Sequence, residues 1–294
     1  MKKAVVKLLA ILCVFTSCVN TIIEEPEELG MKDLVFNAKT YTQTPMSRAE
    51  LSEACTKLSL ALYTKDKDGN YTLYKEVKQE STNSNFGTIA VKDVVYGDYL
   101  LVAIGHKGEN HAVLTNVKSI TFGADDGHIT DTFYYVETLE VAAGTALSHS
   151  IVLNRCVAQF QMIIESAIPD AAEKFKITID GTAVAFDATK ELGVEDIQRI
   201  REINIPTENK GKTNKSIAVY LLLLEKEQSK GSSGINIVVE ALDKDGNVLE
   251  KMTHSNIPAK VGHQTKYTGA FFNDHAFSIS VDSSGWGETI EGNY

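Results

Sequence analysis

The pentapeptide Asp-Lys-Asp-Gly-Asn occurs twice in the 294-residue chain, at 66–70 and at 243–247. Acidic side chains beside a glycine could belong to a calcium loop of the EF-hand type. Such a loop needs oxygen ligands at positions 1, 3 and 5, a glycine at position 6 and a glutamate at position 12. Counted from the first Asp of each copy, the glycine falls at position 4, and position 12 is Val77 or His254. The calcium template therefore fails in both copies.

A β-hairpin explains the repeated pentapeptide better than a calcium loop does. The Asp-Gly dipeptide favours the positive φ angles of a type I′ turn, and segments rich in β-forming residues flank both copies. We therefore predict that Asp68–Gly69 and Asp245–Gly246 lie at the tips of two hairpins, with a structural role.

No other combination of residues predicts a catalytic or metal site. The seven histidines contain no H-x-x-x-H pair and the four cysteines no C-x-x-C pair, which leaves a zinc site unsupported. The chain also lacks G-x-S-x-G, the phosphate loop and G-x-G-x-x-G. Asp125, Asp126 and Asp131 could hold a cation adventitiously, but solvated loop charges are the simpler interpretation. The sequence predicts neither an enzyme nor a bound cofactor.

Residues 1–17 have the features of a lipoprotein signal peptide. Three lysines within the first seven residues precede an apolar run at 8–15, which is too short for a membrane span. The following Phe-Thr-Ser-Cys resembles a lipobox, with Phe15 in place of the usual Leu, and no A-x-A cleavage site lies nearby. We predict that Cys18 becomes the first residue of the mature chain and carries lipid. Several acyl chains would anchor the protein stably.

Composition argues for packed cores and against nucleic acid as a partner. Hydrophobic residues make up 43% of the chain, which is typical of globular domains. The net charge is −10, and no run of Lys or Arg occurs after residue 7, so the clustered positive charge that phosphates require is missing. Cys55 and Cys156 could pair in an exported protein, or could be two buried thiols, which is the simpler expectation.

After an acidic tether at 18–30, the chain is a series of short strand patterns. In the pattern at 57–64, Leu58, Leu60 and Leu62 alternate with smaller or polar residues, which indicates a strand with one face on a core. The small, polar segment at 141–150 predicts a boundary between two domains at 31–147 and 148–294. The expected fold class is all-β, with two tandem β-sandwiches.

Four further expectations concern local features of the second half. The apolar spacing of Val194, Ile197 and Ile200 predicts a short amphipathic helix at 193–203, and 169–175 predicts one helical turn. Arg155 interrupts an apolar strand at 151–164, so it should be paired or lie at an edge. Trp286 is expected in a core or at a sandwich rim, rather than against a ligand.

Several segments, taken in order, resemble the fimbrillin-like subunits of type V fimbriae, and most of all their minor anchor or accessory subunits. The lipobox is followed by KLSLALYTKDKDGN, YGDYLLVAIG, VLNRCVAQFQMII and NIPAKVGHQTKYTGAFFN. This resemblance implies two transthyretin-like β-sandwiches, no enzymatic activity and a lipid anchor at Cys18 in the outer membrane, exposed at the cell surface. It also implies assembly with other fimbrial subunits, each supplying a strand to its neighbour.

The resemblance also implies a use for Arg48. Stalk subunits of such fimbriae lose their first strand when a trypsin-like protease cuts after an arginine, and Arg48 lies between the first two predicted strands. Anchor subunits keep their lipid and are not cut. The eight residues after Trp286 offer no long donor segment, which favours an anchor or tip subunit. The alternative is a glycan-binding surface lipoprotein, although Tyr134 and Tyr135 would face opposite sides of a strand.

Overall fold

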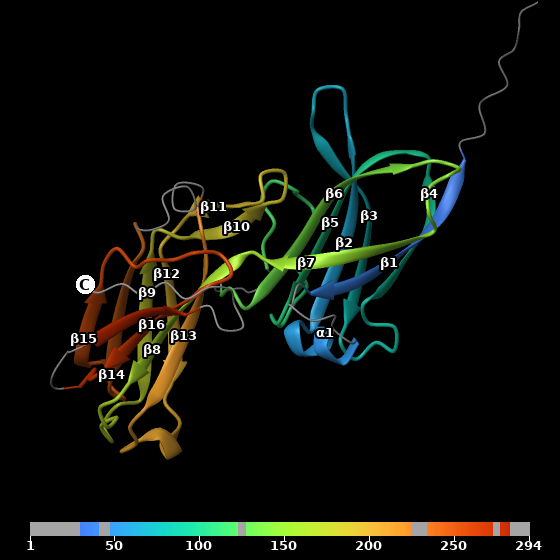
Figure 1. Cartoon of the computed structure of the whole chain (residues 1–294). Helices are drawn as coiled ribbons and strands as arrows, with labels where there is room; N and C mark the ends of the chain where they lie inside the picture. The colour runs from blue at the N-terminus through green and yellow to red at the C-terminus, as the bar shows by residue number, and fades with distance from the viewer. Residues whose placement is uncertain (1–29, 41–47, 123–127, 225–233, 273–276, 283–294) are drawn as a thin grey trace, which may run out of the picture.

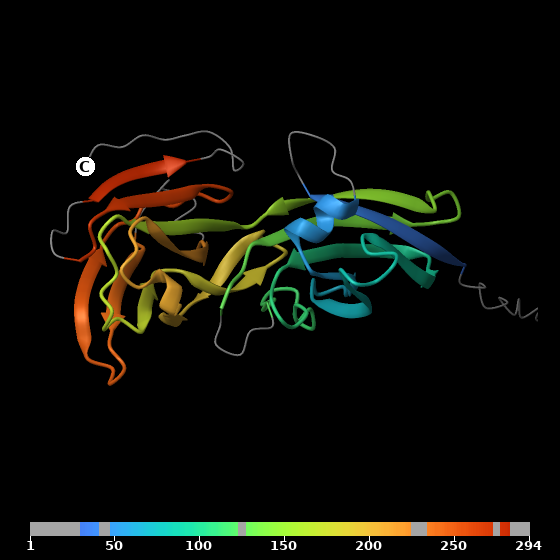
Figure 2. The same cartoon turned by 90° about the horizontal axis from the view of Figure 1, so that it is seen from below.

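Two β-sandwiches lie end to end in the computed structural model, which describes residues 30–40, 48–122, 128–224, 234–272 and 277–282 (Figures 1 and 2). The predicted all-β class is confirmed, since strands dominate these residues. The two helices in the described ranges are short, α1 at Arg48–Ala54 and a 3₁₀ helix at Thr207–Asn209. Within those ranges, no helix has the length and apolar character that crossing a membrane requires.

The first sandwich is built from seven strands in the order β3-β2-β5-β6-β7-β1-β4. Strand β7 joins its two layers, because it pairs in parallel with β1 and then, at Asn154 and Arg155, with β6. The strands are β1 Met31–Thr40, β2 Lys57–Lys65, β3 Tyr71–Glu80, β4 Thr88–Val95, β5 Gly97–His106, β6 Thr132–Val141 and β7 Ser148–Arg155.

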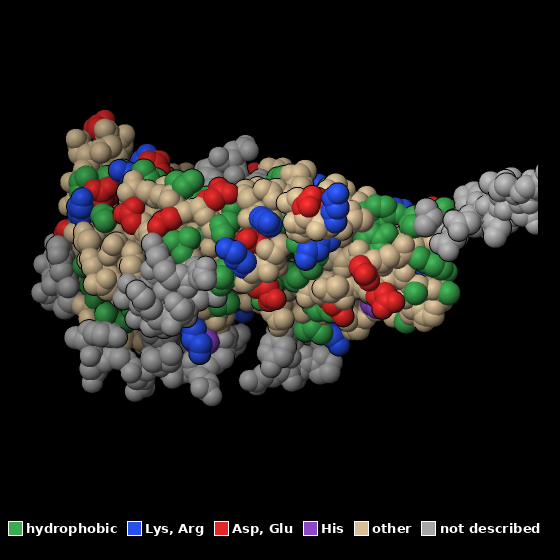
Figure 3. Space-filling view, turned by 90° about the horizontal axis from the view of Figure 1, so that it is seen from above, with side chains coloured by type: hydrophobic (Ala, Val, Ile, Leu, Met, Phe, Trp, Pro, Cys, Tyr) green, Lys and Arg blue, Asp and Glu red, His purple; other side chains and the backbone are tan. Residues whose placement is uncertain are grey.

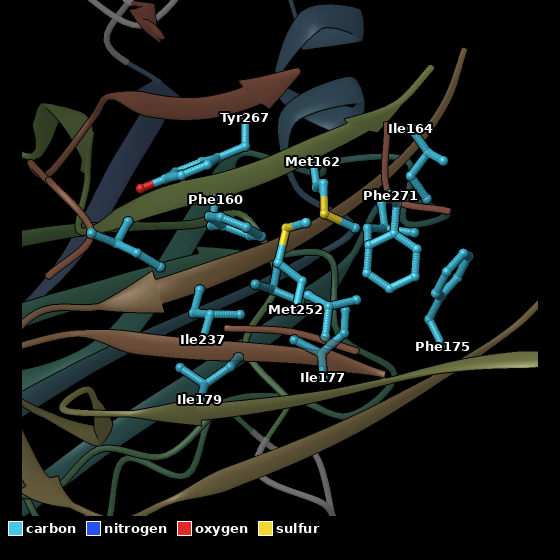
Figure 4. Close-up of a cluster of buried hydrophobic side chains, with 14 of the residues drawn as sticks. Phe160, Met162, Ile164, Phe175, Ile177, Ile179, Ile237, Met252, Tyr267 and Phe271 are labelled. Carbon is cyan, nitrogen blue, oxygen red and sulfur yellow. The ribbon is translucent and has the colours of Figure 1, made fainter. Parts of the chain in front are cut away.

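The second sandwich has a six-stranded sheet, β11-β10-β13-β8-β16-β17, and a four-stranded sheet, β12-β9-β14-β15. Its strands are β8 Val157–Ile164, β9 Lys174–Asp180, β10 Ala183–Asp187, β11 Leu192–Asp196, β12 Arg199–Asn204, β13 Lys215–Leu222, β14 Asn236–Leu242, β15 Val248–His254, β16 Gln264–Gly269 and β17 Phe277–Asp282. Figure 4 shows its core, where Phe160 and Met162 of β8 point toward Ile177 and Ile237 of the opposite sheet.

Strand β2 alternates as predicted, but both of its faces are buried. Leu58, Leu60 and Leu62 pack in the core of the first sandwich. Ala61 and Tyr63 face a separate cluster, here called the junction core, which joins the two sandwiches. Its members come from β2 and β5, from residues 112–122 and 129, and from β8, β10, β13 and the residues just after β10 and β13 in the second sandwich. A strand with apolar residues on both faces therefore marks where the two halves meet.

The segment at 107–122 covers the junction core without forming a regular strand. It contains one isolated bridge, between Val113 and Thr121. The Tyr63 hydroxyl donates to the Leu114 carbonyl at 2.5 Å. Ile120 and Phe186 of the second sandwich exchange two backbone hydrogen bonds of 2.8 Å. The connection between the sandwiches is therefore a packed and hydrogen-bonded interface.

The predicted helix at 193–203 is wrong, because this segment forms the edge strands β11 and β12. Val194 pairs with Ala185, and Ile200 pairs with Thr178. Ile197 and Ile200 are 53% and 50% exposed, so the apolar stripe that suggested a helix is not buried against a core. Pairing with β10 and β9 satisfies the backbone groups on one side of each short segment and outweighs the helical spacing of their side chains.

The apolar run at 151–164 is broken at Cys156 rather than continuous. Before it, β7 belongs to the first sandwich, and after it, β8 pairs with β13 and β16 in the second. The predicted division after residue 147 precedes β7, whereas the change of sheet occurs at Cys156. The small, polar residues at 141–150 mark the turn before β7. Strand pairing, which the composition does not reveal, decides which sandwich β7 joins.

The two copies of the pentapeptide connect β2 to β3 and β14 to β15, and their hydrogen bonds match one for one. In the first copy, the Asp66 N–H donates to the Asn70 carbonyl, and the Asp66 carbonyl accepts the Gly69 N–H. The Asp66 carboxylate accepts the Asp68 and Asn70 N–H groups at 2.9 and 2.8 Å. Positive φ is confined to the glycine, at +86° in Gly69. The turn is thus a type I turn closed by a glycine bulge, not the predicted type I′.

We expect these turns to lose stability in acid. Hydrogen bonds from Asn70, its backbone N–H first, hold the pKa of Asp66 below its usual range, and bonds from Asn247 do the same for the pKa of Asp243. A depressed folded pKa means that the contribution is present at neutral pH and is lost as the pH falls through that value. NMR titration of both carboxyls should show midpoints below that of an aspartate in an unstructured peptide. Midpoints at or above that of the peptide would contradict this.

Candidate functional site

Strand β1 lies inside a sheet, although it comes first in the described chain. Residues 31–37 pair antiparallel with β4, and residues 35–40 pair in parallel with β7. Figure 1 shows β1 alongside β4 and β7. Its loss would therefore open a gap between β4 and β7, and both would then have an unpaired edge.

Two side chains of β1 reach the first core. Leu34 and Phe36 are fully buried, and they alternate with half-buried or exposed neighbours as a half-buried strand requires. The Phe36 ring stacks on His149 of β7, with centroids 5.4 Å apart. Each of the two apolar side chains therefore fills a pocket at a fixed register, and a shift by one residue would place both toward solvent.

Polar contacts hold the N-terminal half of β1. Lys32 Nζ donates to the Ala143 carbonyl at 2.9 Å and so ties β1 to the turn between β6 and β7. The Asp33 carboxylate accepts the N–H of Asp93 at 2.9 Å, where Asp93 has φ of +51°. Lys92 and Asp93 oppose the single residue Asp33, which is a β-bulge in β4. These contacts fix the register of β1 from its side chains as well as its backbone.

The predicted processing residue, Arg48, is the first residue of α1, shortly after β1. Helix α1 is attached to the first core through Leu51, and Cys55 follows it in the same core. Residues 41–47, which link β1 to α1, lie outside the described residues, as do Cys18, Asp125, Asp126 and Trp286. Arg48 therefore begins a helix that packs on the first core through Leu51. Arg48 was expected in a loop, and the short helix was missed.

Arg155 pairs with Asp131, the last of the three acidic residues considered above. The guanidinium donates from Nε and Nη2 to the two carboxylate oxygens at 2.6 and 2.8 Å, and it lies 4.8 Å from the centroid of Phe133. The pair sits where β7 leaves the first sandwich, next to Cys156. A bidentate pair of this kind fixes geometry as well as charge. The expected pairing of Arg155 is found, and its role is structural.

Both remaining cysteines are free and buried, and they lie in different cores. Burial raises the pKa of the Cys55 thiol to about 12 and also raises the pKa of Cys156. We expect neither thiol to react with an aromatic disulfide reagent at pH 8 in the folded protein, since the thiolate is the reactive form. Both of these thiols should react after unfolding in guanidinium. Rapid reaction of either thiol in the folded state would contradict this burial.

Ser59, His111 and Glu80 touch one another in the order of a catalytic triad, which sequence motifs did not indicate. Ser59 Oγ lies 3.2 Å from His111 Nδ1, and His111 Nε2 lies 3.8 Å from Glu80. Ser59 is only 1% exposed in the middle of β2, and Glu80 is held by Lys57 at 2.7 Å. A nucleophile needs room for a substrate carbonyl, so this arrangement reads as packing. Within the described ranges, no group of three potential metal ligands is found.

Charged side chains of both signs are interspersed over the face seen in Figure 3. Lys57–Glu80, Lys174–Glu202 and Lys210–Glu173 form surface ion pairs of this mixed kind. Such a surface does not concentrate the positive potential that a polyanion would need.

A model of a family of unknown function (DUF6562) matches residues 27–293.

A candidate polysaccharide-binding protein (DUF1812) from Bacteroides thetaiotaomicron is similar in structure, with a TM-score of 0.54 and 11% sequence identity. The match covers 88% of this chain and 98% of that one. A candidate adhesin from the same species has a TM-score of 0.52 and 11% identity, with coverage of 90% and 99%. The fimbrial anchor protein Mfa2 from Porphyromonas gingivalis has a TM-score of 0.44 and 14% identity, with coverage of 86% and 97%. No curated protein matches significantly. The predicted resemblance to fimbrillin-like subunits is confirmed at the level of the fold.

Proposed function

This chain belongs to DUF6562, a family of unknown function, and we propose that it is a minor, anchoring subunit of a surface fimbria. In this proposal, lipid on Cys18 holds it to the outer membrane, and it joins other subunits by strand complementation in support of adhesion. The lipobox and the ordered strand motifs support the proposal from the sequence. The description of a structurally similar protein as a candidate adhesin agrees with a role at the cell surface.

The observation that carries the proposal is the position of β1. A first strand that is central to its sheet can be replaced by a strand of another subunit without any change in the other strands. The incoming strand would pair with β4 and β7, and its alternate side chains would fill the pockets of Leu34 and Phe36. Ladder hydrogen bonds and apolar burial would supply the binding energy, and the two pockets would set the register.

The bond after Arg48 separates two fates of the subunit. Both the lipidation residue, Cys18, and β1 precede Arg48, so one cut there would release the lipid anchor and free the first strand together. An uncut chain would keep its anchor, and β1 would fill the groove until an incoming strand displaced it. An anchor subunit should therefore retain β1, and a polymerising subunit should lose it.

The mature N-terminus of the protein taken from cells tests these alternatives. Surface fimbriae are isolated and their subunits identified by mass spectrometry, with a Cys18→Ala variant as the control for lipid. We expect a chain that begins at acylated Cys18 and copurifies with fimbriae. A chain that begins at Ala49 would overturn the anchor role. Absence from fimbriae despite an acylated Cys18 would overturn the fimbrial function itself.

A glycan-binding lipoprotein is the second candidate, favoured by the polysaccharide-binding description of one structurally similar protein. Tyr134 and Tyr135 do not form one sugar-binding platform. The Tyr134 ring packs on Phe186 with centroids 5.0 Å apart and its hydroxyl bonds Glu191, whereas Tyr135 bonds Glu137. Titration of the purified chain with neutral polysaccharides separates the candidates, since the anchor proposal predicts no saturable binding of these.

A further inference from the structure

Three large hydrophobic side chains are exposed at one end of the first sandwich. They are Met31 at the start of β1, Tyr96 directly after β4 and Leu147 directly before β7, and they are 60%, 37% and 60% exposed. Figures 1 and 2 show that this end of the first sandwich is the one farthest from the second sandwich. We call these three side chains the apolar tip.

The residues of the apolar tip belong to neighbouring strands, because β1 lies between β4 and β7. On the β4 side, the Tyr96 N–H donates to the Gly30 carbonyl at 2.8 Å, and the Tyr96 ring occupies the space that a Cβ on Gly30 would need. On the β7 side, the Leu147 carbonyl accepts the N–H of Val35 at 2.8 Å. Single exposed hydrophobic side chains are common, but a group of them around the start of one strand marks a candidate interaction surface.

Charged groups around the apolar tip do not favour an anionic partner. The ammonium group of Lys32, near the start of β1, donates to the carbonyls of Ala142 and Ala143 at 3.3 and 2.9 Å, so its charge is used within the protein. Asp98 and Glu140 lie opposite each other on β5 and β6 at the same end, and both are exposed. A partner at the tip would therefore be held by apolar contact rather than by positive charge.

The distance from the tip to the predicted lipid indicates the partner. The described chain begins at residue 30, beside the tip, and Cys18 precedes it by 12 residues (30 − 18). Twelve residues span at most about 40 Å when fully extended. Lipid on Cys18 would therefore hold this end of the molecule near a bilayer. A tyrosine beside aliphatic side chains suits the boundary between lipid headgroups and acyl chains, because its ring is apolar and its hydroxyl is polar.

We propose that the apolar tip inserts into the headgroup layer of the membrane that carries the lipid on Cys18. This inference rests on the proposed lipid anchor and adds a second contact to it, which orients the subunit on the membrane. Insertion removes the three apolar side chains from water. The second sandwich then extends away from the membrane, where it meets other subunits. Because the contact is apolar, it forms on zwitterionic phosphatidylcholine and persists at high ionic strength.

The test joins the full mature chain, residues 18–294, to vesicles through the Cys18 thiol and a maleimide lipid. Cys55 and Cys156 are buried, so they do not compete for the maleimide. The vesicles are phosphatidylcholine, a fraction of which carries a photoactivatable group in its headgroup, and mass spectrometry locates the crosslinks. We expect a yield at the apolar tip about threefold higher than at Val248 and Leu249, two exposed hydrophobic residues of β15. Raising the ionic strength should leave this ratio unchanged.

Two variants separate insertion of the tip from mere closeness to the vesicle. Met31→Glu with Leu147→Glu places charges at two exposed positions of the tip, so it should lower the crosslink yield at Tyr96 about threefold without changing the Tm in solution. Val248→Glu with Leu249→Glu is the matched control in the second sandwich, and it should leave the yield at Tyr96 unchanged.

Equal crosslink yields at the tip and at β15 in the unchanged chain would overturn the proposal, as would an unchanged yield at Tyr96 in the tip variant. A dimer of the untethered chain in sedimentation, lost in the tip variant, would show that a second copy covers the tip and would also overturn it. The tether is made chemically, so these results do not depend on acylation in cells. An unmodified Cys18 in cells would count against the lipid anchor instead, and mass spectrometry of the N-terminus reads that outcome separately.

Discussion

Cleavage of the chain between β1 and α1 should give a two-piece protein in which the first strand stays bound until a competing strand displaces it. The strand pairs with β4 and β7, and it buries Leu34 and Phe36 completely. Burial of two such side chains contributes about 3–6 kcal/mol. That is comparable to the whole free energy of unfolding of an ordinary domain. We therefore expect the protein that has lost β1 to be strongly destabilised.

The experiment places a specific protease site within 41–47 of the full chain. After cleavage, native mass spectrometry should still find residues 18–40 bound to the remainder. Adding an excess of a peptide of residues 30–40 with a mass label should exchange the strand over time. Loss of the strand without replacement should lower Tm by more than about 10 °C, as roughly 3 kcal/mol implies for a domain of this size.

The matched control is the same peptide with Leu34→Asp and Phe36→Asp. It keeps the backbone donors and acceptors but cannot fill the two pockets, so it should not exchange. Exchange of both peptides at the same rate would mean that backbone pairing alone holds β1, and the proposed register pockets would have no role. Spontaneous release of the strand on cleavage, with an unchanged Tm, would show that β1 contributes little to the first sandwich.

The pattern of β2 shows how far the sequence alone could lead. The alternation of Leu58, Leu60 and Leu62 is a local property, so it predicts the strand and its core-facing side. The burial of Tyr63 on the opposite side depends on the segment at 112–122 and on the second sandwich. Those contacts are far apart in sequence, and no local pattern encodes them. The junction core could not be predicted for that reason.

Strand β12 shows a burial pattern that the sequence could not predict. In its sequence, an alternating strand would be expected to bury the isoleucines and expose the arginines. The structure does the reverse at its start, where Arg199 is buried and Ile200 is half exposed. Such an inversion depends on the position of β12 at the edge of its sheet, beside β9 and close to β13. A charged residue at a buried position is visible only once the sheets are assembled.

Asp131→Ala should be the most destabilising single substitution of a charged residue among the pairs described. It leaves the Arg155 guanidinium without its two carboxylate partners at the point where the chain changes sandwich. Removing one member of a buried pair costs about 3–5 kcal/mol. The two side chains are 12% and 20% exposed, which places the expected loss near about 3 kcal/mol. Urea denaturation, followed by the fluorescence of the tyrosines, measures it.

Two further variants separate the lost pair from lost packing. Asp131→Leu with Arg155→Met removes both charges and fills similar space, so it should recover at least half of the loss. Glu80→Gln breaks the Lys57–Glu80 pair, whose glutamate is 49% exposed, and should destabilise the protein far less than Asp131→Ala does. The double variant could instead be as unstable as Asp131→Ala. The stability would then depend on the geometry of the Asp131–Arg155 pair, and not on the charge of an unpaired Arg155. Equal losses in Asp131→Ala and Glu80→Gln would mean that solvent reaches Arg155 well enough to replace its partner.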